Sequence, residues 1–389
     1  MMKRKIWLFG LLLSFFVSLH ASRQDSIRFS LLTCSPGQEV YSLFGHTAIR
    51  YQNFTRSTDV AFNYGMFSFN TPNFILRFVK GETDYHLGVS SFIGFYHEYA
   101  SRGSTVYEQE LNLTEEEKLT LQQLLFTNFQ PENRVYRYNY FYDNCTTRAR
   151  DQIEKCIRGK IVYPEGRKNA TFRKIIREYT APSPWFGVGI DYCLGAEADE
   201  EIGIRFQMFS PFDMRNFASE AYIENEDGTK RPLVVQETKV VDVPPLESEP
   251  GFFLSPMTCA LIFMLVNFWI AFLQYKRRRI YWGWDLFLYT TQGIAGCLLA
   301  TLFFFSIHPT VGSNWMLALL HPLALLYLPW MAYRMKKGKK DYFSWVNSVY
   351  LTFFIIVFPF LPQDFDLTVL PLTLGLLANA ASHVLVTNK

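Results

Sequence analysis

The sequence predicts an exported α+β domain followed by a bundle of five transmembrane helices. Three observations lead to this fold class. A charged start and an apolar run at the N-terminus are typical of a secretory signal. Between residues 22 and 250, strand-like and helix-like stretches follow one another. From residue 251 to 389 the composition changes to long hydrophobic spans separated by short loops.

Residues 1–21 have the composition of a signal peptide. Lys3–Lys5 forms the charged start, Ile6–Leu19 is the apolar core, and Ala21 is a small residue suited to cleavage. An uncleaved anchor is the alternative. In either case the residues that follow are exported.

A hairpin is predicted near the start of the exported domain. Phe44–Tyr51 and Asp59–Phe67 both have strand-like composition, and a short loop separates them. Because side chains alternate along a strand, His46, Ala48 and Arg50 point to the same face of this hairpin. We therefore expect Asn63 or Tyr64 to lie beside His46.

Two helices follow in the same domain. Thr114–Asn128 starts with a capping box made by Thr114 and Glu117. The second helix begins where an aromatic, strand-like stretch ends at Asn144, so Cys145 is placed at its N-terminus, and it runs to about Cys156. The other predicted elements are strands at Ile27–Leu32, Asp84–Val89 and Ser104–Leu113, a helix at Ile93–Ser101, a hairpin turn at Asp227-Gly228 and a linker at 244–250.

Five hydrophobic spans after the linker are long enough to cross a bilayer. Basic residues cluster at Lys276–Arg279 and Arg334–Lys340, whereas His308–Asn314 and Pro362–Asp366 carry no Lys or Arg. By the positive-inside rule the basic loops are cytoplasmic, which also puts Lys389 inside and the first domain outside. The spans are Phe252–Gln274, Trp282–Ile307, Trp315–Tyr333, Phe343–Leu361 and Leu367–Val386.

Three ionisable residues fall in or near these spans, where such residues are often functional. Asp285 is close to the cytoplasmic end, and its alternative role is simply to reach water. His321 precedes Pro322 and is a candidate to line a cleft near the outer side. His383 lies in the last span.

Composition argues against several classes of function. The net charge of +3 is small, and basic residues are not interleaved with aromatic ones in the exported part, so no nucleic-acid partner is predicted. No Cys-x-x-Cys or His-x-x-His spacing indicates a metal site, and no cofactor is expected.

Cys145 and Cys156 would be about 16 Å apart along one helix, too far for a disulfide. At most one pair forms among Cys34, Cys156 and Cys193.

Cys145 is the candidate nucleophile. At a helix N-terminus the macrodipole favours the thiolate, and free backbone N–H groups there can hold an oxyanion. His46 is the candidate base, because a Cys–His pair performs acyl transfer. A third polar group usually orients the imidazole, and Asn63 is the first candidate and Tyr64 the second. A buried structural Cys is the alternative for Cys145. His86 and His97 are rival bases that no Gly-led strand presents.

Three stretches of the sequence resemble the signature blocks of the Lnb family, the lipoprotein N-acyltransferases of Gram-negative bacteria. This resemblance implies a circularly permuted papain-like fold, as in NlpC-like amidases and lecithin–retinol acyltransferase (LRAT), for residues 22–250. It also implies that His46 is the base and Cys145 the nucleophile, while the motifs fix no third member and Asn63 rests on geometry alone. The matching stretches are Phe44–Arg50, Phe62–Phe67 and Tyr142–Arg148 with Asp151.

The resemblance further implies a reaction between two membrane-held substrates. Cys145 would take an acyl chain from a phospholipid, with phosphatidylethanolamine as the expected donor, and pass it as a thioester to the α-amine of a diacylated lipoprotein. Tyr64, Asp143 and Arg148 are candidate substrate contacts, although Asp143, Arg148 and Asp151 have bracing of the helix as an alternative. The spans offer either a groove for acyl chains or an anchor alone. The expected location is the inner membrane, with the catalytic domain in the periplasm.

Two other functions remain open. A membrane-anchored papain-like cell-wall amidase or peptidase would use the same Cys–His chemistry with water as the acceptor. A non-enzymatic membrane protein would use the exported domain to bind lipid or a partner.

Overall fold

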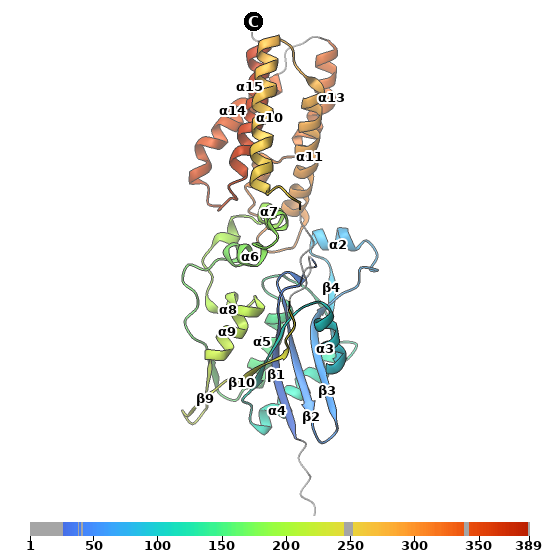
Figure 1. Cartoon of the computed structure of the whole chain (residues 1–389), viewed down its shortest axis with the longest axis vertical. Coiled ribbons are helices and arrows are strands. Elements are labelled where there is room, and N and C mark those ends of the chain that lie inside the picture. The colour runs from blue at the N-terminus through green and yellow to red at the C-terminus, as the bar shows by residue number, and fades with distance from the viewer. Residues whose placement is uncertain (1–25, 38, 40–41, 245–251, 338–341, 388–389) are drawn as a thin grey trace, which may run out of the picture.

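The computed structural model of the chain describes residues 26–37, 39, 42–244, 252–337 and 342–387. The predicted signal peptide and nearly all of the predicted linker lie outside these residues. The described part consists of an antiparallel sheet flanked by helices, with a bundle of long helices beyond one end of the sheet (Figure 1).

The main sheet has seven strands within the described residues, in the order β10-β5-β1-β2-β3-β4-β6, and every neighbouring pair is antiparallel. The predicted hairpin is present as β2 and β3, in which Ala48 is opposite Asn63. The strands are β1 Ile27–Cys34, β2 His46–Asn53, β3 Thr58–Met66, β4 Asp84–Ser91, β5 Val106–Leu111, β6 Val135–Arg137 and β10 Val234–Val241.

Two predicted strand regions differ from the structure. The aromatic stretch before Cys145 is a strand only over β6, and a bridge between Asn139 and Asp143 then turns the chain into the helix. The turn at Asp227-Gly228 joins β8 to the short β9 rather than to a long strand, and the residues after β9 return to the main sheet as β10 beside β5. The small sheet contains β7 Lys160–Val162, β8 Tyr222–Glu224 and β9 Lys230–Pro232.

Helices cover both faces of the main sheet. One face packs on α4 (Glu115–Phe129), α5 (Cys145–Cys156) and α9 (Pro211–Glu220), and it contains the largest apolar cluster. The opposite face packs on α3 (Phe92–Ser101) through a smaller cluster that includes Ala48. The alternation of side chains along β2 therefore sends neighbouring residues into two different cores.

The starts of α4 and α5 are fixed by capping. Thr114 and Glu117 form the predicted capping box of α4. At α5 the Asn144 side chain accepts hydrogen bonds from the amides of Thr146 and Thr147, both at 2.9 Å. The Asn144 amide group in turn donates to two backbone carbonyls, of Tyr140 at 2.8 Å and Phe209 at 2.9 Å. Cys145 is the first residue of α5, as predicted.

A helical region between the sheet and the bundle is centred on a buried arginine. Arg173 is fully buried and pairs with Asp191 at 2.9 Å and Asp199 at 2.7 Å. Arg177 pairs with Asp191 and with Asp364 of the bundle. The acidic residues near 191–201 thus have a structural role that the sequence did not indicate. The helices of this region are α6 Phe172–Thr180, α7 Pro184–Cys193, η2 Ala196–Asp199 and α8 Ile204–Gln207.

The predicted number of membrane spans is confirmed: five helices in the described part are long and apolar enough to cross a bilayer. The third span is interrupted between α12 and α13, where a side chain on Gly296 of α11 would begin 2.3 Å from the backbone of His321. The helices are α10 Pro256–Arg277, α11 Trp282–Phe305, α12 Met316–Leu319, α13 Leu323–Lys336, α14 Tyr342–Val357 with η3 Phe358–Phe360, and α15 Val369–Thr387.

Asp285 does not reach water, contrary to the simpler of its two predicted roles. It is fully buried, its carboxylate lies 3.0 Å from Nε2 of His383, and it accepts a hydrogen bond from Asn379 at 2.8 Å. Three polar side chains from α11 and α15 therefore lie together inside the bundle, where ionisable residues usually pair with one another.

The bundle is joined to the sheet-containing part by hydrogen bonds from its loops. The amide of Gly195 donates to Thr310 at 2.7 Å, and Gln363 donates to Leu194 at 3.0 Å. The chain enters β1 at the end of the sheet far from the bundle, so β1 ends and β2 begins at the near end (Figure 1). His46 is consequently on the side of the sheet that faces the bundle.

Candidate active site

His46 and Cys145 each occupy the first position of an element. His46 begins β2, and Cys145 begins α5. The turn before His46 needs a glycine, because Gly45 has φ 74° and a side chain there would begin 2.5 Å from the carbonyl oxygen of Cys34. Both residues are half-buried.

The side chains of His46 and Cys145 lie close enough to shift each other's pKa. Burial alone would lower the pKa of His46, but the charge of Cys145 and hydrogen bonds with Cys145 and Asn63 raise the pKa overall. For Cys145, burial would raise the pKa of the thiol, but the charge of His46 and its hydrogen bond lower it overall. Both directions favour a thiolate–imidazolium pair.

The surroundings of Cys145 also favour its thiolate. The backbone N–H of Thr47 donates to the sulfur, and this contact contributes to the lowered pKa. The hydroxyls of Thr47 and Thr146 are 2.9 Å apart and connect β2 to the first turn of α5. Gly65 of β3 lies beside the cysteine, since a side chain at Gly65 would begin 3.6 Å from the Cβ of Cys145, and its φ of 84° favours glycine there.

Asn63 lies beside His46 and hydrogen-bonds to it, as expected from the strand register. Its Nδ2 is 3.3 Å from the hydroxyl of Ser90 and 3.4 Å from the carbonyl of Ala61. Because Nδ2 has these two acceptors, Oδ1 is the Asn63 atom suited to accept a hydrogen bond from the imidazole. The structure therefore brings Asn63, His46 and Cys145 together.

Two residues near His46 were not identified from the sequence. Tyr99 of α3 stacks on the imidazole, with ring centroids 6.3 Å apart and planes 11° apart. Ser90 of β4 holds Asn63. Ser90 lies just beyond the predicted strand Asp84–Val89, so no sequence signal pointed to it, and Tyr99 required knowledge of which face α3 covers.

The helix N-terminus offers fewer free amides than expected. Because Asn144 accepts from Thr146 and Thr147, those two N–H groups are not available to an oxyanion. The amide of Cys145 has no hydrogen-bond acceptor among the described residues. It is therefore the one donor of this first turn that remains for an oxyanion.

The candidate substrate contacts are occupied by other interactions. Tyr64 is fully buried on the face of the sheet that packs on α4 and α5, and its hydroxyl donates to Asn128 at 2.7 Å, so the structure gives no support to a substrate contact there. Arg148 makes two hydrogen bonds to the carboxylate of Asp143, at 2.6 and 2.7 Å, and stacks on Tyr136 at 3.5 Å. This geometry braces the start of α5. Asp151 pairs with Arg150 and Arg205.

The rival bases are not part of this cluster. His86 lies on β4 opposite Met66, and burial and Arg134 lower its pKa. His97 is exposed on α3. Neither histidine contributes to the shifted pKa of Cys145. All six cysteines of the chain lie within the described residues and are free thiols, so no disulfide forms.

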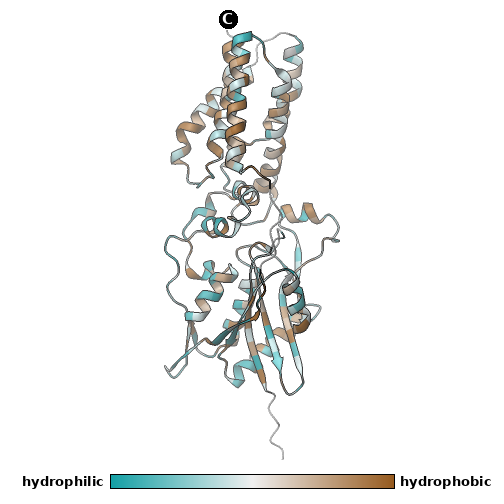
Figure 2. Cartoon of the chain, in the orientation of Figure 1, coloured by the Kyte–Doolittle hydropathy of each residue, from teal (hydrophilic) through white to brown (hydrophobic). Residues whose placement is uncertain are grey.

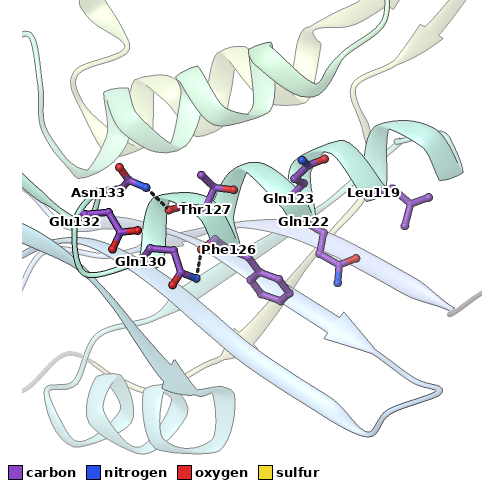
Figure 3. Close-up of a pocket in the computed structure, with 8 residues that line it drawn as sticks. All are labelled: Leu119, Gln122, Gln123, Phe126, Thr127, Gln130, Glu132 and Asn133. Atoms are coloured by element: carbon purple, nitrogen blue, oxygen red, sulfur yellow. Dashed lines mark hydrogen bonds between the residues drawn. The ribbon is translucent and has the colours of Figure 1, made fainter.

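No candidate metal site occurs among the described residues. A pocket lined by residues of α4 and the loop after it, including Leu119, Phe126 and Glu132, contains neither His46 nor Cys145 (Figure 3). It has no nucleophile, so the candidate chemistry stays with the Cys145 cluster.

Comparison with known protein families gives two matches. The family model for the Lnb N-terminal periplasmic domain matches residues 18–180, and that for the Lnb transmembrane domain matches residues 247–389. No curated protein and no solved structure matches the chain. His46, Asn63 and Cys145 all lie within the first match, and the five candidate spans lie within the second. The chain belongs to the Lnb family, with a periplasmic domain followed by a multi-pass domain in the inner membrane.

Proposed function

We propose that this protein is a lipoprotein N-acyltransferase that uses Cys145 to move a fatty acyl chain from a membrane phospholipid to the α-amine of a diacylated lipoprotein. The observation that carries the proposal is the Cys145–His46 pair, whose members shift each other's pKa, at the end of the sheet that faces the membrane domain. Both substrates would be lipids or lipid-anchored chains, which reach such a site without leaving the bilayer surface.

In the first half-reaction the Cys145 thiolate attacks the carbonyl carbon of a phospholipid ester. The resulting oxyanion is stabilised by the free amide of Cys145. The carbon–oxygen bond then breaks, and the leaving glycerol oxygen takes a proton from the His46 imidazolium. The products are an acyl thioester on Cys145 and a lysophospholipid.

In the second half-reaction the free α-amine of the lipoprotein cysteine attacks the thioester. His46, now neutral, accepts a proton from the amine while the carbon–sulfur bond breaks. Cys145 leaves as a thiolate and the amide product is released. Asn63 is the positioning residue in both halves, because it holds the imidazole toward the sulfur in each protonation state.

The finer assignments of fold and orientation belong to the same proposal. A permuted papain-like fold fits the order of the functional elements, in which the histidine strand β2 precedes the cysteine helix α5. A cytoplasmic C-terminus is supported by the contacts of Thr310 and Gln363 with the sheet-containing part, because the basic residues near 276–279 and 334–337 lie at the opposite ends of their helices.

The cell-wall amidase has the same thiol chemistry, so the acceptor must be tested. Purified full-length protein in phosphatidylethanolamine vesicles is mixed with a synthetic diacylglyceryl lipopeptide, and products are measured by mass spectrometry. We expect the lipopeptide to gain one acyl chain and an equal amount of lysophospholipid to form. Cleavage of a peptidoglycan fragment, without any gain of mass by the lipopeptide, would replace the proposal with the amidase.

A further inference from the structure

The helix α2 (Phe74–Lys80) carries large apolar side chains on an exposed surface. Ile75 is 78% exposed and Leu76 is 58% exposed, and Phe69 in the preceding loop is 66% exposed. None of the residues of α2 is buried. We call Phe69, Ile75 and Leu76 the α2 surface. Clustered exposed apolar side chains of this kind mark interaction sites.

The opposite side of α2 is fixed to the end of a membrane span. The amide of Ile307 donates to the carbonyl of Lys80 at 2.9 Å, and Nε2 of His308 lies 2.7 Å from the carbonyl oxygen of Phe78. Val79 packs against an apolar cluster of the bundle. Because α11 ends at Phe305, the α2 surface lies at the level where a span leaves the bilayer.

The lipid-facing surface of α11 continues toward α2. Phe304 and Phe305 at the end of α11 and Ile307 just after it are all exposed. Figures 1 and 2 show α2 beside the end of the bundle nearest the sheet, with hydrophobic residues on both. The α2 surface therefore lies next to the exposed apolar end of a candidate membrane span. The nearby cations are already paired, Arg77 with Asp84 and Lys80 with Glu82, so the surface is apolar rather than basic.

A row of aromatic rings leads from α2 to the candidate nucleophile. Neighbouring centroids along the row are 5.7, 5.1 and 4.2 Å apart. The Tyr138 ring at the end of the row and the Cβ of Cys145 are each 3.6 Å from the point where a Gly65 side chain would begin, so they line the same space. The rings in order are Phe74, Phe67, Tyr85 and Tyr138.

We propose that the α2 surface lies in the outer leaflet of the membrane, and that the aromatic row guides an acyl chain of a bilayer lipid from there to Cys145. The second half rests on the proposed function, whereas the contact with lipid does not. Burying an exposed Ile or Leu side chain in the leaflet is favourable, and aromatic rings suit the membrane–water boundary.

Lipid contact is tested by photo-crosslinking in the full-length Cys145→Ala protein, so that no turnover interferes. A diazirine amino acid replaces Ile75 in one sample and Ile93 in the control, and the vesicles contain phosphatidylethanolamine with a clickable acyl chain. Ile93 is a matched site because it is 63% exposed, like Ile75, but it follows the C-terminal end of β4, whereas α2 precedes the N-terminal end of that strand. We expect strong lipid labelling from residue 75 and background labelling from residue 93. Equal labelling, or crosslinks from residue 75 to protein instead of lipid, would overturn the proposal.

The route to Cys145 is tested with the Ile75→Glu/Leu76→Glu variant beside the Ile93→Glu control. Acyl transfer from vesicle phospholipid should fall by about tenfold or more, because each buried aliphatic side chain contributes at least that factor. Acylation of Cys145 by a short water-soluble ester should be unchanged, which also shows that the variant is folded. Equal loss with both donors, or no loss with phospholipid, contradicts the route. If the diazirine at residue 75 labels lipid yet Cys145 of the wild-type protein is never acylated, the lipid contact stands and the proposed function is wrong.

Discussion

Replacing Asn63 with alanine tests whether this side chain sets the charge state of the candidate pair. Asn63 hydrogen-bonds to His46 and contributes to its raised pKa, while the charge of His46 lowers the pKa of Cys145. In Asn63→Ala the pKa of His46 should therefore fall and that of Cys145 should rise. Less of the protein would then be in the thiolate–imidazolium form near neutral pH.

The size of the effect follows from the one hydrogen bond that is lost. A hydrogen bond to a charged group contributes about 1.5–3 kcal/mol. That energy corresponds to roughly one to two pKa units for His46. If the pair limits the first half-reaction, acyl transfer should fall by roughly ten- to a hundredfold.

Alkylation of Cys145 by iodoacetamide, followed peptide by peptide with mass spectrometry across pH, reports the thiolate directly. The acid limb of the profile should move to higher pH in Asn63→Ala. Asn63→Asp keeps an acceptor oxygen and should restore much of the wild-type profile, and Gln236→Ala on an exposed part of β10 is the surface control. An alkylation profile in Asn63→Ala that overlays wild type, in a folded protein, would refute the orienting role.

Three further outcomes follow from single contacts. Because His46 lowers the pKa of Cys145 against the opposing effect of burial, His46→Ala should move alkylation of Cys145 to alkaline pH, and a wild-type pH profile in that variant would disprove the pairing. Arg173→Ala leaves Asp199 without this partner and Asp191 with Arg177 alone, and it should lower the free energy of unfolding by about 3–5 kcal/mol, seen as a lower thermal midpoint in detergent. Gly296→Ala would place a methyl group 2.3 Å from the backbone at the break in the third span, whereas a methyl group at Gly283 meets nothing within 4 Å. Only the former variant should destabilise the bundle, by about 1–3 kcal/mol, and equal stability of the two would contradict the packing.

The features that local pattern determines were predictable from the sequence. The capping box of α4 and the start of α5 at Cys145 depend on residues a few positions apart. The five spans follow from length and composition. The β2–β3 hairpin, and with it the position of Asn63 beside His46, follows from strand alternation and a short loop.

Features that depend on distant contacts were not predictable. The sequence does not tell that β10 returns to pair with β5, or that Tyr99 of α3 lies over His46, because both depend on how remote segments pack. Burial of Asp285 requires partners on a helix near the other end of the membrane domain.

The catalytic roles of Cys145 and His46 are predictions that only chemistry can test. The most direct measurement is the mass of the Cys145 peptide after the purified protein has been incubated with phospholipid and quenched in acid. We predict one fatty acyl group on that peptide, lost when a lipopeptide amine is added, absent in Cys145→Ala and retained in Cys297→Ala. N-acylated lipopeptide produced by the Cys145→Ala protein, or an acyl group trapped on a different residue, would contradict the account.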